Sequence, residues 1–188
     1  MNCQNRNCTY KIDKDDFLYK TLIISLAPVI YGVKPIHLVC LSDEKDFDIY
    51  IYKIKYYLNL FFKIKYKKIK CKHGRVKILF YNVNKIEVLL KDKSNCVFLE
   101  SKGHCYSADY KYFIDFFSKK LKYNKIPHEI GLFFGYPLKD VVGFIEHPNE
   151  YKTASYGWQV YGDTIPSRKI YSLFENAKLE MKEFLESA

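Results

Sequence analysis

The feature that most constrains the fold is a stretch marked by glycine and proline, residues 126–145 (IPHEIGLFFGYPLKDVVGFI). Pro127 and Pro137 each suit the first position of a helix, where the missing N–H costs nothing. Gly135 lies between them, at the place where a left-handed residue commonly ends a helix. The pattern predicts two short helices joined at a Gly-Tyr-Pro corner.

Two further glycines, Gly131 and Gly143, fall inside the predicted helices. Glycine in a helix interior costs about 1 kcal/mol relative to alanine. We therefore expect both glycines to lie against other backbone or a ligand, and the segment around Trp158 is the candidate neighbour.

Hydrophobic spacing along the rest of the chain predicts an α+β fold: a small, mainly antiparallel sheet with a Lys-rich hairpin, packed by helices, and a helical C-terminal half. Pro28 is expected to end the first helix or to open the next turn. We expect a flexible N-terminus over residues 1–14 and a single α+β domain over residues 15–188. The predicted strands are residues 36–41, 64–72, 75–81 and 158–161, and the longest predicted helices cover residues 47–61 and 166–185.

The second and third predicted strands form a β-hairpin whose side-chain alternation slips by one residue at Lys67-Lys68. Such a slip is typical of a β-bulge, and His73-Gly74 then supplies a two-residue turn. The register that follows pairs Cys71 with Val76, Ile69 with Ile78, and Tyr66 with Phe80.

One face of this hairpin is predicted to be strongly basic, with Tyr66 and Tyr81 interleaved. Such a surface can follow a phosphate backbone and stack bases, so nucleic acid is one alternative partner. The other interpretation is a solvated edge hairpin that lysines protect from aggregation. The residues concerned are Lys63, Lys65, Lys68, Lys70, Lys72, Arg75 and Lys77.

The composition restricts the function only loosely. The formal net charge of +10 permits binding to nucleic acid, acidic proteins or anionic membranes and selects none of them. No apolar run has the length of a transmembrane helix, and the N-terminal residues lack the apolar core of a signal peptide. We therefore expect a cytoplasmic protein with no membrane partner, whose six cysteines are free thiols.

The most enzyme-like pair in the sequence is His128-Glu129. A neutral imidazole can ligate a metal or act as a base. Glu129, as the third residue of a helix that starts at Pro127, can instead accept from a free N–H, as in half a capping box. Neighbouring helical side chains diverge by about 100°, so the two do not easily serve one centre. The pair is a catalytic candidate beside its structural role.

The candidates for metal ligation are Cys71, His73, His104 and Cys105. Zinc needs about four converging ligands, and this spacing matches no known zinc finger. The alternative is that the cysteines are small buried apolar residues. A metal-dependent or redox enzyme is thus one alternative function, and the cofactor is unknown.

The candidates for binding a ligand or a partner are Lys34, Tyr136, Asp140 and Trp158. Lys34 follows a glycine-bearing loop and Asp140 follows the corner, so each can hold an anion or a partner, although Asp140 can equally cap its own helix. Tyr136 and Trp158 are either exposed aromatic residues for a planar ligand or core residues. No nucleotide-binding loop or nucleophile elbow occurs.

The last predicted helix carries an apolar stripe at helical spacing. The stripe predicts core packing or, alternatively, the seam of a homodimer. Its members are Ile170, Leu173, Phe174, Ala177, Met181, Phe184 and Leu185.

Three segments together resemble an uncharacterised bacterial family, the domain of unknown function DUF3793. They are Ala27-Pro28-x-x-x-Gly32-x-Lys34, the pattern PHEIGxFxGYPxxDVxGFI over residues 127–145, and Trp158-x-Val160-Tyr161. The resemblance spans nearly the whole chain and implies one family domain without an established activity. Family members occur near iron-uptake and flavodoxin genes, so the resemblance also implies an iron-related context.

The sequence as a whole favours a non-catalytic accessory protein that binds a small ligand or a protein partner around the Gly-Tyr-Pro corner. Nucleic-acid binding by residues 63–77 and a metal-dependent or redox enzyme are the alternatives.

Overall fold

The computed structural model describes residues 14–42, 47–48, 51–52, 54, 64–105, 107–147, 149 and 151–187, without the side chains of residues 14–18 and 73. Three predictions fall on other residues. Residues 1–13 of the predicted flexible N-terminus, most of the predicted helix over residues 47–61, and Lys63 of the basic hairpin lie outside the described part of the chain.

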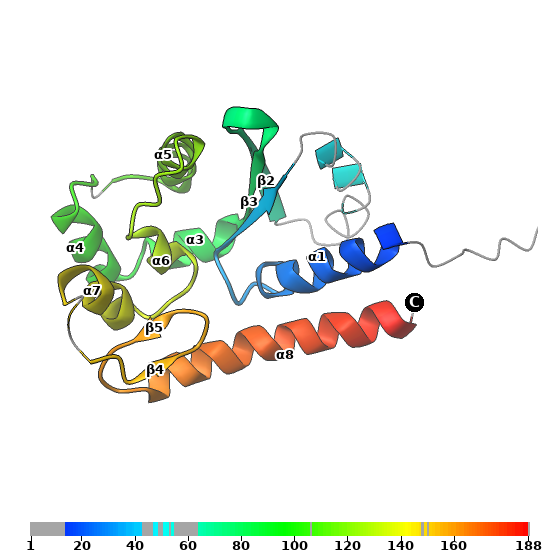
Figure 1. Ribbon diagram of the computed structural model, residues 1–188. Coiled ribbons are helices and arrows are strands. Elements are labelled where there is room, and N and C mark those ends of the chain that lie inside the picture. Colours follow the sequence, from blue (N-terminus) through cyan, green and yellow to red (C-terminus); the bar gives the residue numbers. More distant parts are fainter. Residues whose placement is uncertain are drawn as a thin grey trace, which may run out of the picture.

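Within the described residues, a three-stranded antiparallel sheet forms the centre of the fold (Figure 1). Its strands are β1 (Ile36–Leu41), β2 (Ile64–Lys70) and β3 (Val76–Asn82), in the order β1-β3-β2. β3 is apolar and buried at nearly every position, because both of its faces are covered. The predicted α+β class with a small antiparallel sheet is confirmed.

Helices cover both faces of this sheet (Figure 1). Val76, Ile78 and Phe80 share an apolar cluster with α1 (Lys14–Ile30) and α8 (Ile165–Ser187), which lie side by side and antiparallel. Leu79 and Tyr81 point to the opposite face and a second cluster. That second layer contains α3 (Val83–Leu89), α4 (Lys93–Ser101), α5 (Tyr110–Lys122), α6 (Ile130–Phe133) and α7 (Leu138–Glu146).

The apolar stripe of α8 packs mostly within the chain. Ala177, Met181 and Leu185 lie in the cluster with α1 and β3, whereas Leu173 and Phe184 are exposed. The predicted core role is therefore confirmed for the inner residues, and the homodimer seam stays a prediction. Among the described helices, none has both the length and the apolar character that crossing a bilayer requires.

Of the two alternatives predicted for Pro28, the first is wrong: the helix does not end at Pro28 but continues to Ile30. A proline inside a helix removes its own N–H donor without preventing its carbonyl from accepting. The Pro28 carbonyl accepts from the N–H groups of Val33 (2.9 Å) and Lys34 (2.8 Å), and these bonds close the C-terminal turn of α1.

The segment around Trp158 is not a strand of the central sheet, which corrects a second prediction. β5 (Gln159–Val160) pairs instead with β4 (Ala154–Ser155) in a separate small hairpin. This hairpin lies between α7 and the start of α8 (Figure 1).

The hairpin of β2 and β3 contains no bulge. Each of the seven residues of β2 pairs with one residue of β3. Tyr66 faces Phe80 as predicted, but Ile69 faces Lys77 rather than Ile78. The extra residue lies in the turn, which is the three-residue 3-10 segment η1 (Lys72–Gly74), and its glycine has a left-handed φ of 71°. A longer turn thus replaces the predicted bulge.

Candidate functional site

The Gly-Tyr-Pro corner joins α6 to α7 as predicted. Gly135 has a φ of 80° and follows the end of α6, and Pro137 precedes α7 with a φ of −53°. The N–H of Tyr136 donates to the carbonyl of Gly131 over 3.1 Å, which closes the turn between the helices. These two short helices hold most of the candidate site.

The first of these helices begins three residues later than predicted, at Ile130. Residues 127–129 form a turn in which the N–H of Ile130 donates to the Pro127 carbonyl over 3.1 Å. Glu129 therefore makes no capping hydrogen bond, and the predicted capping box is wrong. Its carboxylate lies 3.3 Å from Nε2 of the buried His104, whose Nδ1 lies 3.1 Å from the Tyr112 hydroxyl.

The predicted pair His128-Glu129 is consequently divided between two places. Glu129 faces His104, whereas the exposed His128 lies with its ring edge-on to Phe144, at 5.1 Å between ring centres. The two side chains do not converge on one reaction centre.

Both helix glycines lie against another part of the chain. A methyl group on Gly143 would lie 2.5 Å from the Tyr161 ring, and one on Gly131 would lie 3.2 Å from Val141 and 3.3 Å from Tyr136. The predicted close approach is confirmed, and Tyr161 directly follows β5. The atoms nearest to these added methyl groups belong to side chains rather than to backbone, and the alternative of contact with a ligand stays a prediction.

Asp140 is the residue that connects the elements around the corner. It is only 2% exposed, and its carboxylate accepts four hydrogen bonds from the described residues. Oδ1 accepts from Lys139 Nζ (2.6 Å) and from the Tyr161 N–H (3.0 Å). Oδ2 accepts from the Trp158 indole N–H (2.8 Å) and the Ser167 hydroxyl (2.6 Å). Four donors occupy the lone pairs of both oxygens, so Asp140 ties α7, β5 and α8 together instead of capping its own helix.

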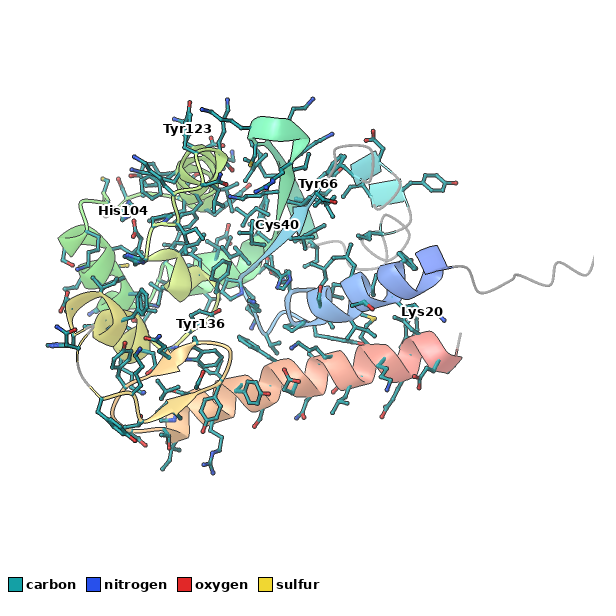
Figure 2. The ribbon with its side chains drawn as sticks, viewed as in Figure 1. Lys20, Cys40, Tyr66, His104, Tyr123 and Tyr136 are labelled. Atoms are coloured by element: carbon teal, nitrogen blue, oxygen red, sulfur yellow. The ribbon has the colours of Figure 1, made fainter. Side chains whose placement is uncertain are left out.

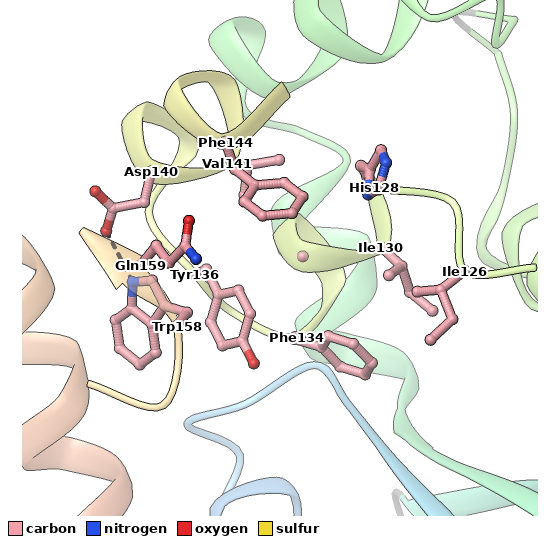
Figure 3. Close-up of a pocket in the computed structure, with 11 residues that line it drawn as sticks. Ile126, His128, Ile130, Phe134, Tyr136, Asp140, Val141, Phe144, Trp158 and Gln159 are labelled. Carbon is pink, nitrogen blue, oxygen red and sulfur yellow. Dashed lines mark hydrogen bonds between the residues drawn. The ribbon is translucent and has the colours of Figure 1, made fainter. Parts of the chain in front are cut away.

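Trp158 and Tyr136 form a stacked pair at the corner. Their ring centres are 4.6 Å apart and their planes differ by 17°. Figure 3 shows the two rings next to each other, with the indole N–H bonded to Asp140. Phe174 of α8 adds an edge contact to Trp158 at 6.2 Å, and burial raises the pKa of the Tyr136 hydroxyl. The two predicted aromatic residues are therefore half-buried and held in fixed positions.

A pocket of about 230 Å³ opens beside this stacked pair (Figure 3). Its walls are mainly apolar and come from α6 and the residues before it, the corner, α7, and the start of β5 with the preceding residue. Three of the four predicted binding residues, Tyr136, Asp140 and Trp158, line it together. We call it the corner pocket, defined by Ile126, His128, Ile130, Gly131, Phe134, Tyr136, Asp140, Val141, Phe144, Trp158 and Gln159.

Two polar side chains, His128 and Gln159, line the corner pocket in addition to Asp140. The Tyr161 hydroxyl donates to Oε1 of Gln159 over 2.9 Å, which fixes the orientation of that amide. The amide N–H groups of Gln159 then face no acceptor among the described residues. His128 and Gln159 also line an adjoining hollow that contains Lys152, so the polar end of the pocket lies next to a positive charge.

Lys34, the fourth predicted binding residue, lies outside the pocket. Its ammonium is 5.3 Å from the ring centre of Phe134, which lines the pocket, and 5.6 Å from that of Phe174. The same ammonium lies 3.3 Å from Nδ1 of His37. Burial, aided by the charge of Lys178, lowers the pKa of Lys34 to about 8. Burial, aided by both lysines, lowers the pKa of His37 to about 3.

The candidate metal ligands are dispersed through the molecule. Cys71 lies 3.8 Å from the Leu121 carbonyl, and His104 lies among aromatic residues beside α5 (Figure 2). Cys105 is exposed, and its hydrogen bond with Ser107 lowers the pKa of its thiol. Among the described side chains, which exclude His73, no three His, Cys, Asp or Glu groups gather as a metal site would require.

The basic side chains of the hairpin do not share one face, because the regular register alternates them. Lys65 and Lys67 lie on the face covered by α5, and Lys68 lies on the face covered by α1. The Lys68 ammonium is 3.9 Å from the ring centre of Phe47, and that of Lys65 is 5.8 Å from Tyr110. The predicted single basic face is therefore divided between two sides of the sheet.

The remaining basic residues of the hairpin lie toward its tip. Lys77 donates to the Leu121 carbonyl (2.9 Å) and to Asn124 (2.8 Å), so it joins the hairpin to the end of α5. Lys70, Lys72 and Arg75 are exposed near the turn.

Sequence reasoning missed several residues that complete the corner pocket. Phe144 lies four residues after Asp140 and thus on the same face of α7, a spacing that would have indicated it. No pattern in the sequence indicates that Gln159 and Phe134 line a pocket. Ser167 is 27 residues from Asp140, and no pattern in the sequence relates the two.

The fold and the site together define a small α+β protein with an aromatic-lined pocket at a helix–corner–helix motif. The family model described as Protein of unknown function (DUF3793) matches residues 22–188, so the chain belongs to this family. The resemblance seen in the sequence is thereby confirmed. No curated protein and no solved structure matches the chain.

Proposed function

We propose that this protein is a cytosolic, non-catalytic accessory protein that binds a small planar ligand in the corner pocket. One observation carries the proposal. The stacked rings of Trp158 and Tyr136 form a wall of the pocket, and Asp140 holds Trp158 in place with a carboxylate whose lone pairs are all occupied. A general acid or base must reach the reacting proton, and the bonded oxygens of Asp140 face protein donors instead. Because Asp140 is not free for proton transfer, its role is to position the pocket wall, which supports binding rather than catalysis.

The lining of the pocket indicates the class of ligand. Ligand sites commonly combine apolar and aromatic walls with a few polar groups that fix orientation. At about 230 Å³ the corner pocket is smaller than the roughly 300–1,000 Å³ of drug-sized sites, which favours a ligand of one or two rings. His128 and Gln159 can donate to a carbonyl or carboxylate, and Lys152 lies in the adjoining hollow. We therefore favour a planar ring compound that carries an acidic or carbonyl group.

A fluorescence titration tests this proposal directly. Trp158 is the only tryptophan of the chain and lines the pocket, so its emission reports on pocket occupancy. The neutral probe N-phenyl-1-naphthylamine and the anionic probe 8-anilinonaphthalene-1-sulfonate are each titrated into the folded protein. We expect a saturable change in Trp158 emission with both probes and tighter binding of the anionic probe.

Matched variants separate the pocket from the general surface. Ile126→Asp and Phe144→Asp place a charge on the pocket wall at side chains that are 56% and 41% exposed, so folding tolerates them. Val88→Asp and Val97→Asp introduce the same charge at exposed apolar residues outside the pocket. We expect the first pair to weaken binding of the neutral probe at least about tenfold, a loss of roughly 1.4 kcal/mol, and the second pair to leave it unchanged.

Two results would contradict the proposal. One is the absence of any saturable Trp158 response to either probe. The other is equal affinity in the pocket variants and the matched surface variants, which would place the probes elsewhere.

A further inference from the structure

Three hydrogen-bonded side chains lie beside the start of α5 and share no residue with the corner pocket. Glu129 comes from the turn before α6, His104 from the segment between α4 and α5, and Tyr112 from the first turn of α5. Oε1 of Glu129 lies 3.3 Å from Nε2 of His104, whose Nδ1 lies 3.1 Å from the Tyr112 hydroxyl. We call these three residues the Tyr112 triad.

The Tyr112 triad runs from the interior of the protein to its surface. The side chains of His104 and Glu129 are 3% and 14% exposed, whereas Tyr112 is 41% exposed. Tyr112 is therefore the member that a molecule in solution can reach, and the other two residues act on it from the protein side.

Packing fixes the imidazole of His104 between its two partners. The ring centres of Phe113 and Phe116 lie 5.0 and 4.8 Å from that of the imidazole, and the Tyr112 ring lies at 5.8 Å. The backbone N–H of His104 donates to the Leu99 carbonyl over 3.1 Å, which ties this segment to α4. A ring that is held from several sides keeps each nitrogen aimed at one partner, as a positioned base requires.

The chemistry of the two partners decides which nitrogen of His104 carries the proton. An ionised carboxylate only accepts hydrogen bonds, so the Nε2 proton lies toward Glu129 and Nδ1 is left to accept from the Tyr112 hydroxyl. Enzymes that activate a hydroxyl use the same order of nucleophile, base and a group that orients the base.

Hydrogen bonding alone explains part of this arrangement, because a buried imidazole needs partners for its two nitrogens. It does not require a carboxylate on one side and an exposed hydroxyl on the other. That polarity directs the hydroxyl proton of Tyr112 inward and leaves its oxygen toward solvent.

We propose that Tyr112 is a nucleophilic hydroxyl that takes an acyl group from an activated ester. The Tyr112 oxygen forms a bond to the acyl carbon, and the C–O bond of the ester breaks with its electron pair on the departing oxygen. The hydroxyl proton passes to Nδ1 of His104 and then to that departing oxygen, while the Glu129 carboxylate stabilises the imidazolium. The product is a tyrosyl ester and a free alcohol.

This step is a stoichiometric modification and does not depend on the ligand proposed for the corner pocket. Tyr112 lines neither the corner pocket nor the hollow beside it. We therefore expect the reactivity of the ester, rather than its shape, to decide which donors react.

Site-resolved acetylation tests the proposal. The folded protein is incubated with p-nitrophenyl acetate, and acetylation of each tyrosine is followed over time by peptide mass spectrometry. Tyr123 and Tyr151 serve as controls within the same molecule, because they are 65% and 88% exposed and have no histidine partner among the described residues. We expect Tyr112 to react at least about tenfold faster than either, although it is less exposed, since general-base assistance is worth about 10² to 10⁴.

Two variants test the base and its orientation. His104→Gln removes the base, and Glu129→Gln presents an amide that can donate to Nε2, which favours the tautomer with its proton on the wrong nitrogen. We expect each to slow acetylation of Tyr112 at least about tenfold while Tyr123 keeps its wild-type rate. His128→Gln, at an exposed histidine, is the matched control and is expected to leave the Tyr112 rate unchanged.

Two further measurements separate a chemical role of the triad from a structural one. Far-UV circular dichroism and the Tyr123 rate show whether each variant is folded, and the comparison of tyrosines in the wild type stays decisive if His104→Gln does not fold. Acetylation of Tyr112 is expected to slow in heavy water in the wild type but not in His104→Gln, since a proton reaches His104 during the step.

Three outcomes would overturn the proposal. The first is acetylation of Tyr112 no faster than that of Tyr123 and Tyr151, and the second is no acetylation of Tyr112 at all. The third is a wild-type Tyr112 rate in folded Glu129→Gln and His104→Gln, which would assign the triad a purely structural role.

Discussion

At the scale of single residues, Asp140 is a buried carboxylate that accepts four hydrogen bonds from the described residues. Removing a carboxylate from water is costly unless its oxygens are fully hydrogen-bonded. Here Lys139 supplies the opposite charge, and three further donors complete the shell. The carboxylate therefore stabilises the site only as long as every donor remains in place.

Replacing this carboxylate by an amide tests that dependence. Asp140→Asn keeps the shape of the side chain but turns an NH2 group toward donors that need an acceptor. We expect the free energy of unfolding in urea to fall by roughly 3 kcal/mol. Asp92→Asn is the matched control, because Asp92 is an exposed N-cap where aspartate and asparagine perform alike. Equal stability of the two variants would show that the Asp140 hydrogen bonds are energetically unimportant.

A second prediction concerns pH and His37. Its pKa is about 3 in the folded protein because of burial and the nearby charges of Lys34 and Lys178, against an ordinary value of 6.5. Between these two values the unfolded chain binds the proton more readily than the folded chain does. This residue therefore makes the protein lose stability as the pH falls from 6.5 toward 3.

Urea unfolding at a series of pH values measures this contribution. His37→Gln is expected to flatten the decrease in stability over that pH range, since glutamine does not titrate. His147→Gln, at an exposed histidine, is the matched control for the loss of an imidazole. A variant at His37 with an unchanged slope would assign the acid sensitivity to other groups.

At the scale of elements, the sequence predicted what depends on local periodicity and missed what depends on distant neighbours. β1, β3 and α8 follow from their apolar patterns and were found. The hairpin register was wrong because the adjacent Lys67 and Lys68 break the alternation of side chains without breaking the ladder. Lysine can lie on either face of an edge strand, since its ammonium reaches water from both.

In the candidate site, too, the features set by local sequence were predicted and those set by distant residues were missed. The corner was predictable because Gly135 and Pro137 fix backbone angles locally. The role of Glu129 was not predictable, because its partner His104 lies in the segment before α5, 25 residues earlier in the chain. Apart from the adjacent Lys139, the partners of Asp140 lie on two other segments, around β5 and in α8, and no local pattern specifies such an assembly.

Helix α8 provides a test of element packing. Met181 is fully buried against α1 and β3, whereas Leu179 on the same helix is 57% exposed. Met181→Ala is expected to cost about 2–5 kcal/mol because it leaves a cavity, and Leu179→Ala less than about 0.5 kcal/mol. Chemical denaturation of both variants checks this difference. A comparable loss from Leu179→Ala would reveal that its side chain contacts a second molecule.

At the scale of the whole molecule, the two apolar clusters lie on opposite faces of one sheet. β3 contributes Ile78 and Phe80 to one cluster and Leu79 and Tyr81 to the other. A single strand thus belongs to both halves of the core, and disrupting either half exposes it. The single domain over residues 15–188 stays a prediction.

The expected consequence is one cooperative unfolding transition. Trp158 fluorescence reports on the region around the corner pocket, and far-UV circular dichroism reports on all helices. We expect the thermal transitions from the two signals to coincide, as two-state unfolding requires. Separate midpoints would show that the corner region unfolds independently of the α1–α8 layer.

The four hydrogen bonds of Asp140 also bear on the order of assembly. Their donors extend from Lys139 to Ser167, and Ser167 lies in the first turn of α8, which is itself packed along α1. Burying a carboxylate without its donors is costly, so we expect the wall of the corner pocket to close only once the first turn of α8 is in place. On the ribosome, where the chain emerges from its N-terminus, the pocket is completed only after synthesis has reached the C-terminal helix.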